Sequence, residues 1–349
     1  MPVYCEDPRV SQWGMETMDE IYPLAKDTEN PLVDLRYVLS MKREHQGPDT
    51  EDFVAEDYHK GTGGKSQLPF WSSDARFRFQ NVTLEQVAWQ NQIHKLRLPS
   101  LTKAQAAGYN HAWFFHTPIV DCPNMLEAFL DELTSKRNDR GDADVNVETG
   151  VYYQSQEELI EEAKRLDCDA IVNCTGMGAS ELCGDSDMTP ARGVLLKYDR
   201  DSCKRLDHSM DKSLPLDTAN QLHDACIFAD EAPWATRDLP SYMIIRGNDI
   251  VIGGTCLMGD EETKVRPEER KRLLETARLL GIDTGACQPK EEWVGFRPYR
   301  QQIRCEVDEK YSAANINDGI RLVHCYGTGG SGWTIYTGLS KEAARLVLQ

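Results

Sequence analysis

The sequence has no long hydrophobic run and no cysteine framework. No stretch approaches the ~18 consecutive apolar residues that a membrane helix needs, and residues 1–7 lack the basic start and apolar segment of a signal peptide. The 11 cysteines are odd in number and scattered, and none forms a C-x-x-C pair, which argues against disulfides and a zinc site. We therefore expect an intracellular protein that is not inserted in a membrane.

Positive charge is also scarce. The chain has 39 Lys and Arg against 57 Asp and Glu, and its net charge of −18 is spread along the sequence. Repulsion from phosphate groups disfavours nucleic acid and anionic membranes as partners, so small molecules or proteins remain. At 349 residues and 40% hydrophobic composition, the chain can bury a core in one large or two medium domains.

Hydrophobic periodicity predicts helices and strands in mixed order, which favours an α/β or α+β architecture. Polar stretches at 30–65 and 136–146 are interpreted as loops or insertions. Residues 246–249 form a predicted hairpin turn. The predicted helices are 124–136, 156–166, 267–280 and 339–348, and the predicted strands are 113–116, 170–173, 193–197, 242–245, 250–254 and 321–324.

Two blocks near the C-terminus carry the clearest functional signal. The first, 295–300, contains Arg297, whose guanidinium is suited to hold a carboxylate through two parallel hydrogen bonds. The second, 326–334, is a glycine-rich turn that opens a helix, where backbone amides can approach a planar or anionic ligand. Together they predict an enzyme that binds a cofactor and an acid.

Three further segments complete a recognisable order. The apolar strand 169–176 ends in Thr-Gly, Thr-Pro-Ala-Arg-Gly follows at 189–193, and Tyr242 precedes the hairpin. With the two C-terminal blocks, this order resembles the D-amino-acid oxidase and D-aspartate oxidase family. The resemblance is thin before Gly108 and close after Asp169.

The resemblance implies an α/β plus α+β fold in which two domains are threaded discontinuously. A doubly wound FAD-binding domain, truncated at its N-terminus, would comprise 143–198 and 303–349. A substrate-binding domain on a large, mainly antiparallel sheet would comprise 1–142 and 199–302, with a lid near 232–241.

The resemblance also implies roles for single residues. Arg297 would clamp the substrate carboxylate, Tyr242 would add a hydroxyl hydrogen bond, and the Gly330 carbonyl would accept from the substrate amine. The residues implied to contact FAD are Thr175, Tyr153, Gly329, Gly330, Ser331, Gly332, Trp333 and Thr334.

The implied reaction is the oxidation of a D-amino acid by FAD, with hydride transfer from Cα to flavin N5 and reduction of O2 to hydrogen peroxide. A related oxidase acting on glycine or an N-methyl amino acid, and a truncated non-catalytic binding protein, remain open alternatives, as does a homodimer. The implied compartment is the cytoplasm or the peroxisome, although residues 347–349 are not the Ser-Lys-Leu peroxisomal signal.

The sequence departs from the family pattern at its beginning. No strand followed by G-x-G-x-x-G and a helix is present, and residues 61–64, Gly-Thr-Gly-Gly, lack the flanking strand and helix. We therefore expect an incomplete sequence whose full product is an active oxidase. Cys256 stands where acidic-substrate members would favour an arginine, which favours neutral substrates, while Arg237 in the lid could pair with an acidic side chain.

Other reactive side chains are interpreted as structural. His116 and His324 each lie inside an apolar run and are expected to be core histidines whose nitrogens contact the backbone. The thiols in similar runs are expected to be buried and inert; they are Cys174, Cys256, Cys305 and Cys325.

Overall fold

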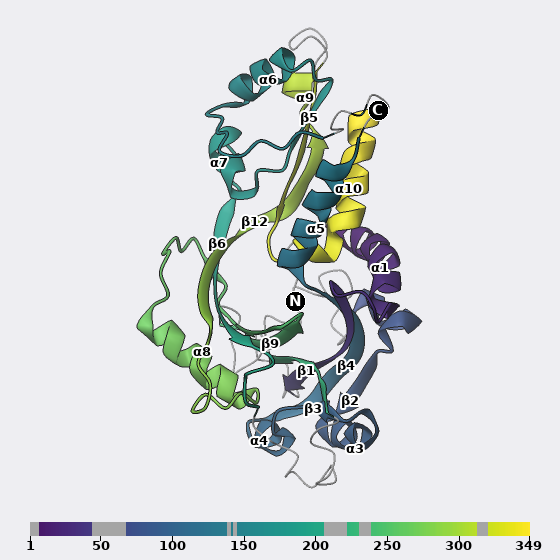
Figure 1. Cartoon of the computed structure of the whole chain (residues 1–349), viewed down its shortest axis with the longest axis vertical. Coiled ribbons are helices and arrows are strands. Elements are labelled where there is room, and N and C mark those ends of the chain that lie inside the picture. Colours follow the sequence, from purple (N-terminus) through teal and green to yellow (C-terminus); the bar gives the residue numbers. More distant parts are fainter. Residues whose placement is uncertain are drawn as a thin grey trace, which may run out of the picture. The chain divides into compact units, whose positions relative to one another are not determined.

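A computed structural model of the chain describes residues 7–43, 68–137, 141, 145–205, 222–229, 239–312 and 320–349 (Figure 1). The chain divides into two compact units that alternate along the sequence. Unit 1 comprises Met1–Glu20, Val120–Ala191 and Arg297–Gln349, and unit 2 comprises Ile21–Ile119 and Arg192–Phe296. Helix α1 (Val10–Lys26) and strands β6 (Thr189–Asp199) and β12 (Glu291–Val307) each run from one unit into the other.

Unit 2 is built on a mainly antiparallel sheet whose strands follow the order β2-β4-β1-β8-β9-β10-β6. Within this order β1 and β8 pair in parallel, with Val38 opposite Cys226. The strands are β1 (Val33–Arg43), β2 (Gln80–Thr83), β4 (Tyr109–Val120), β8 (Cys226–Ala229), β9 (Ser241–Arg246) and β10 (Asp249–Gly253), and the short strands β3 (Leu96–Arg97), β7 (His223–Asp224) and β11 (Leu257–Met258) lie outside this order.

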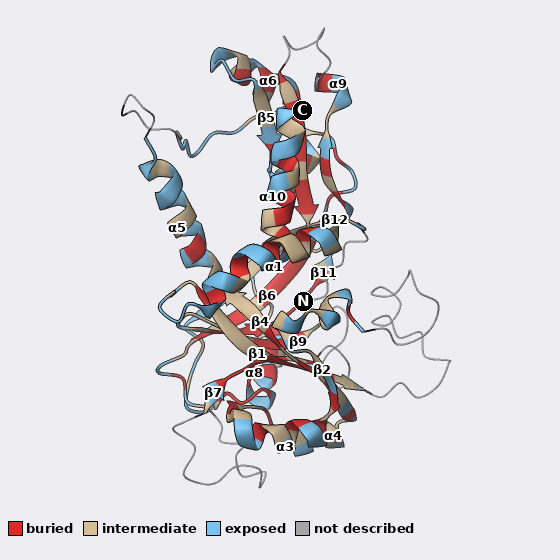
Figure 2. Ribbon diagram, turned by 90° about the vertical axis from the view of Figure 1, so that its right-hand side faces the viewer, coloured by how far each residue is buried: buried red, intermediate tan, exposed pale blue. Residues whose placement is uncertain are grey.

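Helices cover the core of unit 2. The helices are α3 (Leu84–His94), α4 (Leu101–Ala106) and α8 (Pro267–Leu279), and the 3-10 turns are η1 (Phe70–Ser73) and η2 (Ala75–Phe77). Phe114, Met243 and Leu273 belong to one buried cluster, which gathers residues from the strands and from α8. Buried residues, red in Figure 2, are concentrated on these strands.

Unit 1 combines three neighbouring strands, in the order β12-β13-β5, with several helices. Strand β13 (Arg321–Thr328) is antiparallel to β12 and parallel to β5 (Ala170–Asn173). The helices of this unit are α5 (Cys122–Ser135), α6 (Gln156–Arg165), α7 (Ala179–Leu182), α9 (Glu309–Ser312) and α10 (Gly332–Leu348), with the 3-10 turn η3 (Gly176–Gly178).

Trp13 explains why the first part of α1, up to Glu20, belongs to unit 1. Its side chain is fully buried in a cluster with Val323 of β13 and Leu339 of α10, and its indole N–H donates to Glu342 at 2.6 Å. Burying an aromatic side chain of this size contributes several kcal/mol of transfer free energy (on the order of 25 cal/mol per Å²). The expected domain boundaries, which placed all of 1–142 with the substrate domain, therefore differ from the observed units.

The predicted fold class is confirmed, since a large, mainly antiparallel sheet is combined with helices. The predicted helices and strands are all present, and the β9–β10 hairpin turns where expected, with Arg246 opposite Asp249. The loop predicted at 30–65 is wrong for 33–43, which form β1; 44–67 lie outside the described residues. Residues 295–300, which include Arg297, form an extended part of β12.

Two expectations about buried side chains also change. Cys256 and Cys305 are buried, but Cys174 is exposed. The pKa of the Cys174 thiol is lowered because the Cys325 thiol donates to it. His116 and His324 are buried as expected, but neither contacts the backbone through a ring nitrogen: His324 bonds side chains, and His116 Nδ1 has no partner among the described residues.

Within the described part of the chain, no helix is both long and apolar enough to cross a membrane.

Candidate functional site

A glycine-rich turn connects β13 to α10 in unit 1. Gly329 has a left-handed φ of 54°, and its amide donates to the carbonyl of Pro298 at 2.8 Å, which fixes the turn against β12. The Ser331 hydroxyl donates to the carbonyl of Thr328 at 2.7 Å and does not cap α10. The helix therefore presents an uncapped positive end, where a negative or carbonyl oxygen would be stabilised.

Protein carbonyls already accept from half of the amides in this turn. The amides of Gly329, Ser331 and Thr334 donate to backbone oxygens. The three amides that make no hydrogen bond within the described part of the chain are those of Gly330, Gly332 and Trp333. These three amides are therefore available to a ligand.

Arg297 lies beside this turn, also in unit 1. Its side chain is half-buried and donates to the carbonyl of Ala191 at 3.5 Å. A Cβ on Gly330 would lie 3.5 Å from Arg297 Cδ, so the two residues are in contact distance. The structure therefore brings together the predicted carboxylate clamp and the predicted amine acceptor.

Tyr242 lies in unit 2 and is 5% exposed. It stands directly opposite Gly253 in the β9–β10 ladder, and its ring lies across that glycine. A Cβ on Gly253 would be 2.0 Å from Tyr242 Cζ, so only glycine permits this approach. Phe228 packs on the same ring at 6.0 Å between centroids.

Sequence reasoning missed Arg272, which lies next to Tyr242 in unit 2. Its guanidinium donates to the carbonyls of Gly254 and Leu239. Burial lowers the pKa of Arg272, and the interactions with Glu269 and then Tyr242 act in the opposite direction. A basic residue beside the buried Leu273 within an otherwise charged helix is too common a pattern to have identified it.

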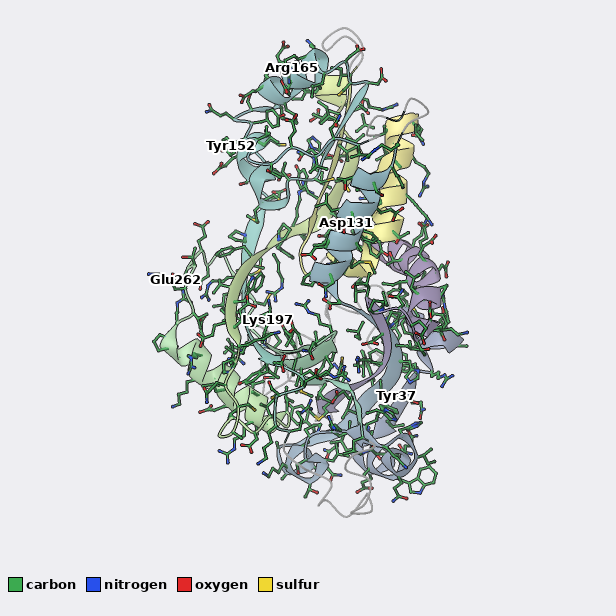
Figure 3. All side chains as sticks on the ribbon, viewed as in Figure 1. Tyr37, Asp131, Tyr152, Arg165, Lys197 and Glu262 are labelled. Carbon is green, nitrogen blue, oxygen red and sulfur yellow. The ribbon has the colours of Figure 1, made fainter. Side chains whose placement is uncertain are left out.

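The predicted FAD contacts Thr175 and Tyr153 lie elsewhere in unit 1. Thr175 is exposed directly after β5, and Asn173 Oδ1 accepts from both its backbone amide at 3.1 Å and its hydroxyl at 2.7 Å. Tyr153 is half-buried in the loop before α6, next to Tyr152, whose hydroxyl donates to Glu181 at 3.0 Å (Figure 3).

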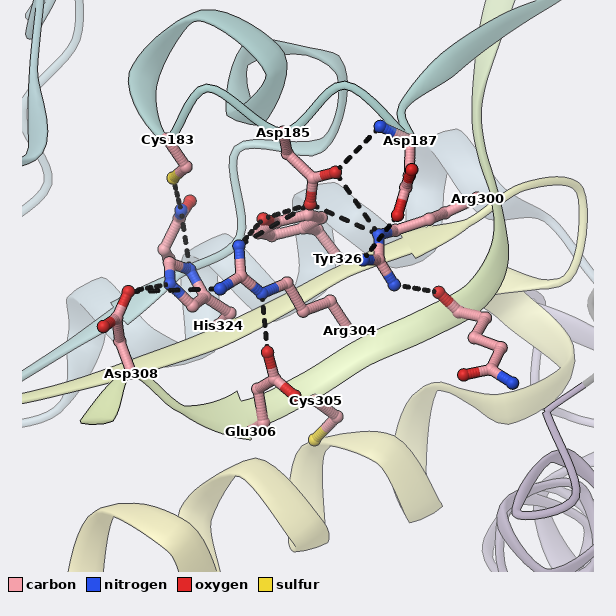
Figure 4. A network of polar contacts seen from close by, with 12 residues as sticks. Cys183, Asp185, Asp187, Arg300, Arg304, Cys305, Glu306, Asp308, His324 and Tyr326 are labelled. Carbon is pink, nitrogen blue, oxygen red and sulfur yellow. Dashed lines mark hydrogen bonds and ion pairs between the residues drawn. The ribbon is translucent and has the colours of Figure 1, made fainter. Parts of the chain in front are cut away.

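A polar network surrounds the end of β5 and was not predicted (Figure 4). Tyr326 donates to Asp185 at 2.8 Å and accepts from Arg304 at 2.7 Å, and Arg300 pairs with Asp185 at 3.2 Å. Burial opposes the charge of Asp185, yet its pKa is lowered, because Tyr326 donates to it and two arginines lie nearby. Burial raises the pKa of Tyr326. Among the described residues, no group of side chains is arranged to hold a metal ion.

Comparison with known proteins assigns the chain to a protein family. Residues 2–346 match the model of the family described as FAD dependent oxidoreductase. The chain belongs to this family. The predicted resemblance and FAD as the family's cofactor are thereby confirmed. The uncapped end of α10 and its three available amides are compatible with such a cofactor.

Members of the FAD dependent oxidoreductase family with similar sequences include two amino-acid oxidases. The chain is 27% identical to the D-amino-acid oxidase of Streptomyces coelicolor over 72% of this chain and 65% of that protein. It is 29% identical to the D-aspartate oxidase of Homo sapiens over 51% of this chain and 44% of that protein. The chain thus spans about half to two thirds of the length of such relatives.

The fold of the family is also found in solved structures. The glycine oxidase from Bacillus cereus superimposes with a TM-score of 0.58 over 99% of this chain and 84% of that protein, at 14% identity. At that identity the match concerns the fold alone.

Proposed function

We propose that the protein oxidises D-amino acids with FAD, giving an imino acid, later a keto acid, and hydrogen peroxide. The observation that carries this proposal is the contact between Arg297 and Gly330 at the uncapped start of α10. A cation for a carboxylate, a carbonyl for an ammonium group and a positive helix end are there found together in a member of an FAD-dependent family. The similarity to D-amino-acid and D-aspartate oxidases supports the substrate class.

The chain's own residues would bind and orient the two reactants. Arg297 would hold the substrate carboxylate through two parallel hydrogen bonds, and the Gly330 carbonyl would accept from the amine, which directs Cα. Tyr242 would donate its hydroxyl to the same carboxylate. Bound FAD would supply the acceptor for the hydride of Cα and the route for its electrons to O2.

The turn before α10 would hold the flavin. The amides of Gly330, Gly332 and Trp333, with the positive helix end, would stabilise negative charge at the pyrimidine edge of the ring. Gly329, Ser331 and Thr334 would shape this turn, because their amides already donate to the backbone. Thr175 and Tyr153 would contact other parts of the cofactor.

Unit 1, which carries Thr175 and the α10 turn, would bind FAD. Of the lid proposed at 232–241, only 239–241 belong to the described residues, and Arg237 lies outside them. Cys256, which is buried, offers no charge to an acidic substrate and favours a neutral one.

The test uses FAD-loaded protein and D-alanine. Replacing Arg297 with Met removes a bidentate contact to a charged group, which costs about 1.5–3 kcal/mol, so KM should rise about 10- to 150-fold. Arg297→Lys keeps the charge, so its KM should lie between that of the parent and that of Arg297→Met. Arg270→Met, an exposed arginine paired with Glu292 at 2.6 Å, is the matched control and should leave KM unchanged.

Peroxide formation decides between the alternatives. We expect peroxide with D-alanine and none with L-alanine. Faster turnover of glycine or N-methyl glycine than of any D-amino acid would instead favour a related amine oxidase. A folded chain that binds no FAD would contradict the enzyme and favour a non-catalytic binding protein.

A further inference from the structure

The hydroxyl proton of Thr175 already forms a hydrogen bond within the protein. Asn173, which is 3% exposed at the end of β5, accepts from the Thr175 amide at 3.1 Å and from Thr175 Oγ1 at 2.7 Å through the same oxygen. A hydroxyl that donates in this way offers only lone pairs to a further partner. A ligand group that meets Thr175 Oγ1 must therefore be a donor.

The same bonds fix the orientation of the Asn173 amide. Because Oδ1 accepts twice, Nδ2 carries the protons, and it lies 3.0 Å from Cys183 Sγ and 3.2 Å from His324 Nδ1. His324 Nδ1 must then be an acceptor without a proton. His324 is fully buried, and its Nε2–H donates to Asp308 Oδ2 at 2.9 Å, which is the neutral tautomer that this pattern requires.

Asp308 anchors this chain of bonds at the other end. Its Oδ1 accepts from the amides of Lys310 and Tyr311 at the start of α9, at 3.0 and 3.2 Å. Its Oδ2 accepts from Gln156 of α6 at 3.4 Å in addition to His324. Both carboxylate oxygens are needed as acceptors, so the His324 tautomer is set by a residue that is itself held by two helices.

We propose that Asp308 and His324 are positioning residues that act through Asn173 to present Thr175 Oγ1 as an acceptor for a hydroxyl or N–H group of FAD, and not for a phosphate oxygen. This inference rests on the proposed binding of FAD by unit 1. Phosphate oxygens are acceptors and would face the lone pairs of Thr175 Oγ1, whereas the ribityl, ribose and ring N–H groups of FAD are donors.

Asp308→Asn is the decisive variant. Because Asp308 Oδ1 accepts from the amides of Lys310 and Tyr311, an asparagine at this position keeps its oxygen there and places its NH2 opposite His324 Nε2. This arrangement moves the His324 proton to Nδ1, where it opposes the protons of Asn173. Nitrogen NMR of the histidine-labelled protein should show His324 protonated at Nε2 in the parent and at Nδ1 in the variant, and an unchanged tautomer would contradict the proposal.

The binding of FAD itself, followed by quenching of flavin fluorescence, tests the path through Thr175. Thr175→Val and Asp308→Asn should each weaken binding about 2- to 10-fold, the range of one neutral hydrogen bond, while Thr175→Ser should bind as the parent does. In the Thr175→Val background, Asp308→Asn should cause no further loss. Additive losses would refute the positioning role, because a purely structural effect does not depend on Thr175.

Two controls separate the possible failures. Asp187→Asn alters a largely exposed carboxylate that pairs with Arg300 at 3.2 Å in the same region and should change neither readout. Thermal unfolding of each variant shows whether it is folded. A parent that binds FAD but oxidises no D-amino acid would refute the reaction and leave this inference standing, whereas a parent that binds no FAD would refute both.

Discussion

Two buried histidines show how differently the same residue type is accommodated. His324 exchanges hydrogen bonds with Asn173 and Asp308, while His116 Nδ1 has no partner among the described residues. Apolar neighbours in the sequence correctly predicted that both are buried. They could not reveal the partners, because Asp308 and Asn173 reach His324 from other segments of the chain.

The environment of His116 has a consequence for stability. Burial lowers its pKa to about 4, and the charges of Arg78 and His94 act in the same direction. A histidine whose pKa is lower in the folded state leaves stability intact above about pH 6.5 and reduces it as the pH falls toward 4. The free energy of unfolding should therefore drop by about 2 kcal/mol from this group between pH 7 and pH 5.

His116→Gln should remove this part of the pH dependence. Urea denaturation at pH 7 and pH 5 measures it, with the difference between parent and variant isolating the histidine from the carboxylates. His223→Gln, at an exposed histidine of the same unit, is the control and should retain the parent's slope. A variant at position 116 with the parent's slope would show that the imidazole does not titrate differently on folding.

At the scale of elements, α10 was predicted from Leu339 but begins at Gly332. Its first turns contain Gly332, Thr334 and Gly338, which are poor helix formers, so local propensity underestimates the helix. The packing against α1 decides its length. The polar composition of 30–65 likewise predicts a loop, whereas Val33–Arg43 form β1, whose partner β8 lies far along the sequence.

The contact between α1 and α10 depends on one glycine. A Cβ on Gly338 would lie 2.4 Å from Trp13 Cα, which is backbone and cannot yield. Gly338→Ala should therefore lower the free energy of unfolding by about 1–3 kcal/mol, despite the higher helix propensity of alanine. Chemical denaturation measures the loss.

Gly14→Ala is the matched control on the facing helix. A Cβ there would lie 3.9 Å from the Thr334 carbonyl, an ordinary contact distance. Alanine in a helix interior is favoured over glycine by about 0.5–1 kcal/mol, so this variant should be equal to or more stable than the parent. Equal losses at both positions would contradict the close-packing explanation for Gly338.

At the scale of the whole molecule, FAD binding should slow amide exchange in unit 1 and not in unit 2. If unit 1 holds the cofactor, amides of 170–182 and 327–334 should exchange more slowly with solvent in its presence. At an FAD concentration of 100 times the dissociation constant, binding raises the free energy of unfolding by about 2.7 kcal/mol. Hydrogen exchange followed by mass spectrometry, with and without FAD, measures this at peptide resolution.

Peptides of α3 and α4 in unit 2 are the internal control and should exchange equally in both states. Protection confined to unit 2 would contradict the assignment of FAD to unit 1. Adenosine monophosphate at the same concentration lacks the flavin and should leave 327–334 unprotected, since the α10 turn is proposed to hold the ring.

The sequence by itself determined the family, the mixed fold class and the two C-terminal blocks around Arg297 and Gly330. These are local patterns of residue type and spacing, which hydrophobic periodicity and glycine chemistry make readable. Only the tertiary structure decided that three amides of the turn remain available, that Trp13 packs the first part of α1 into unit 1, and that Asp308 is linked to Thr175 through His324 and Asn173. Such contacts depend on hydrogen-bond partners and packing between distant segments, which no local pattern encodes.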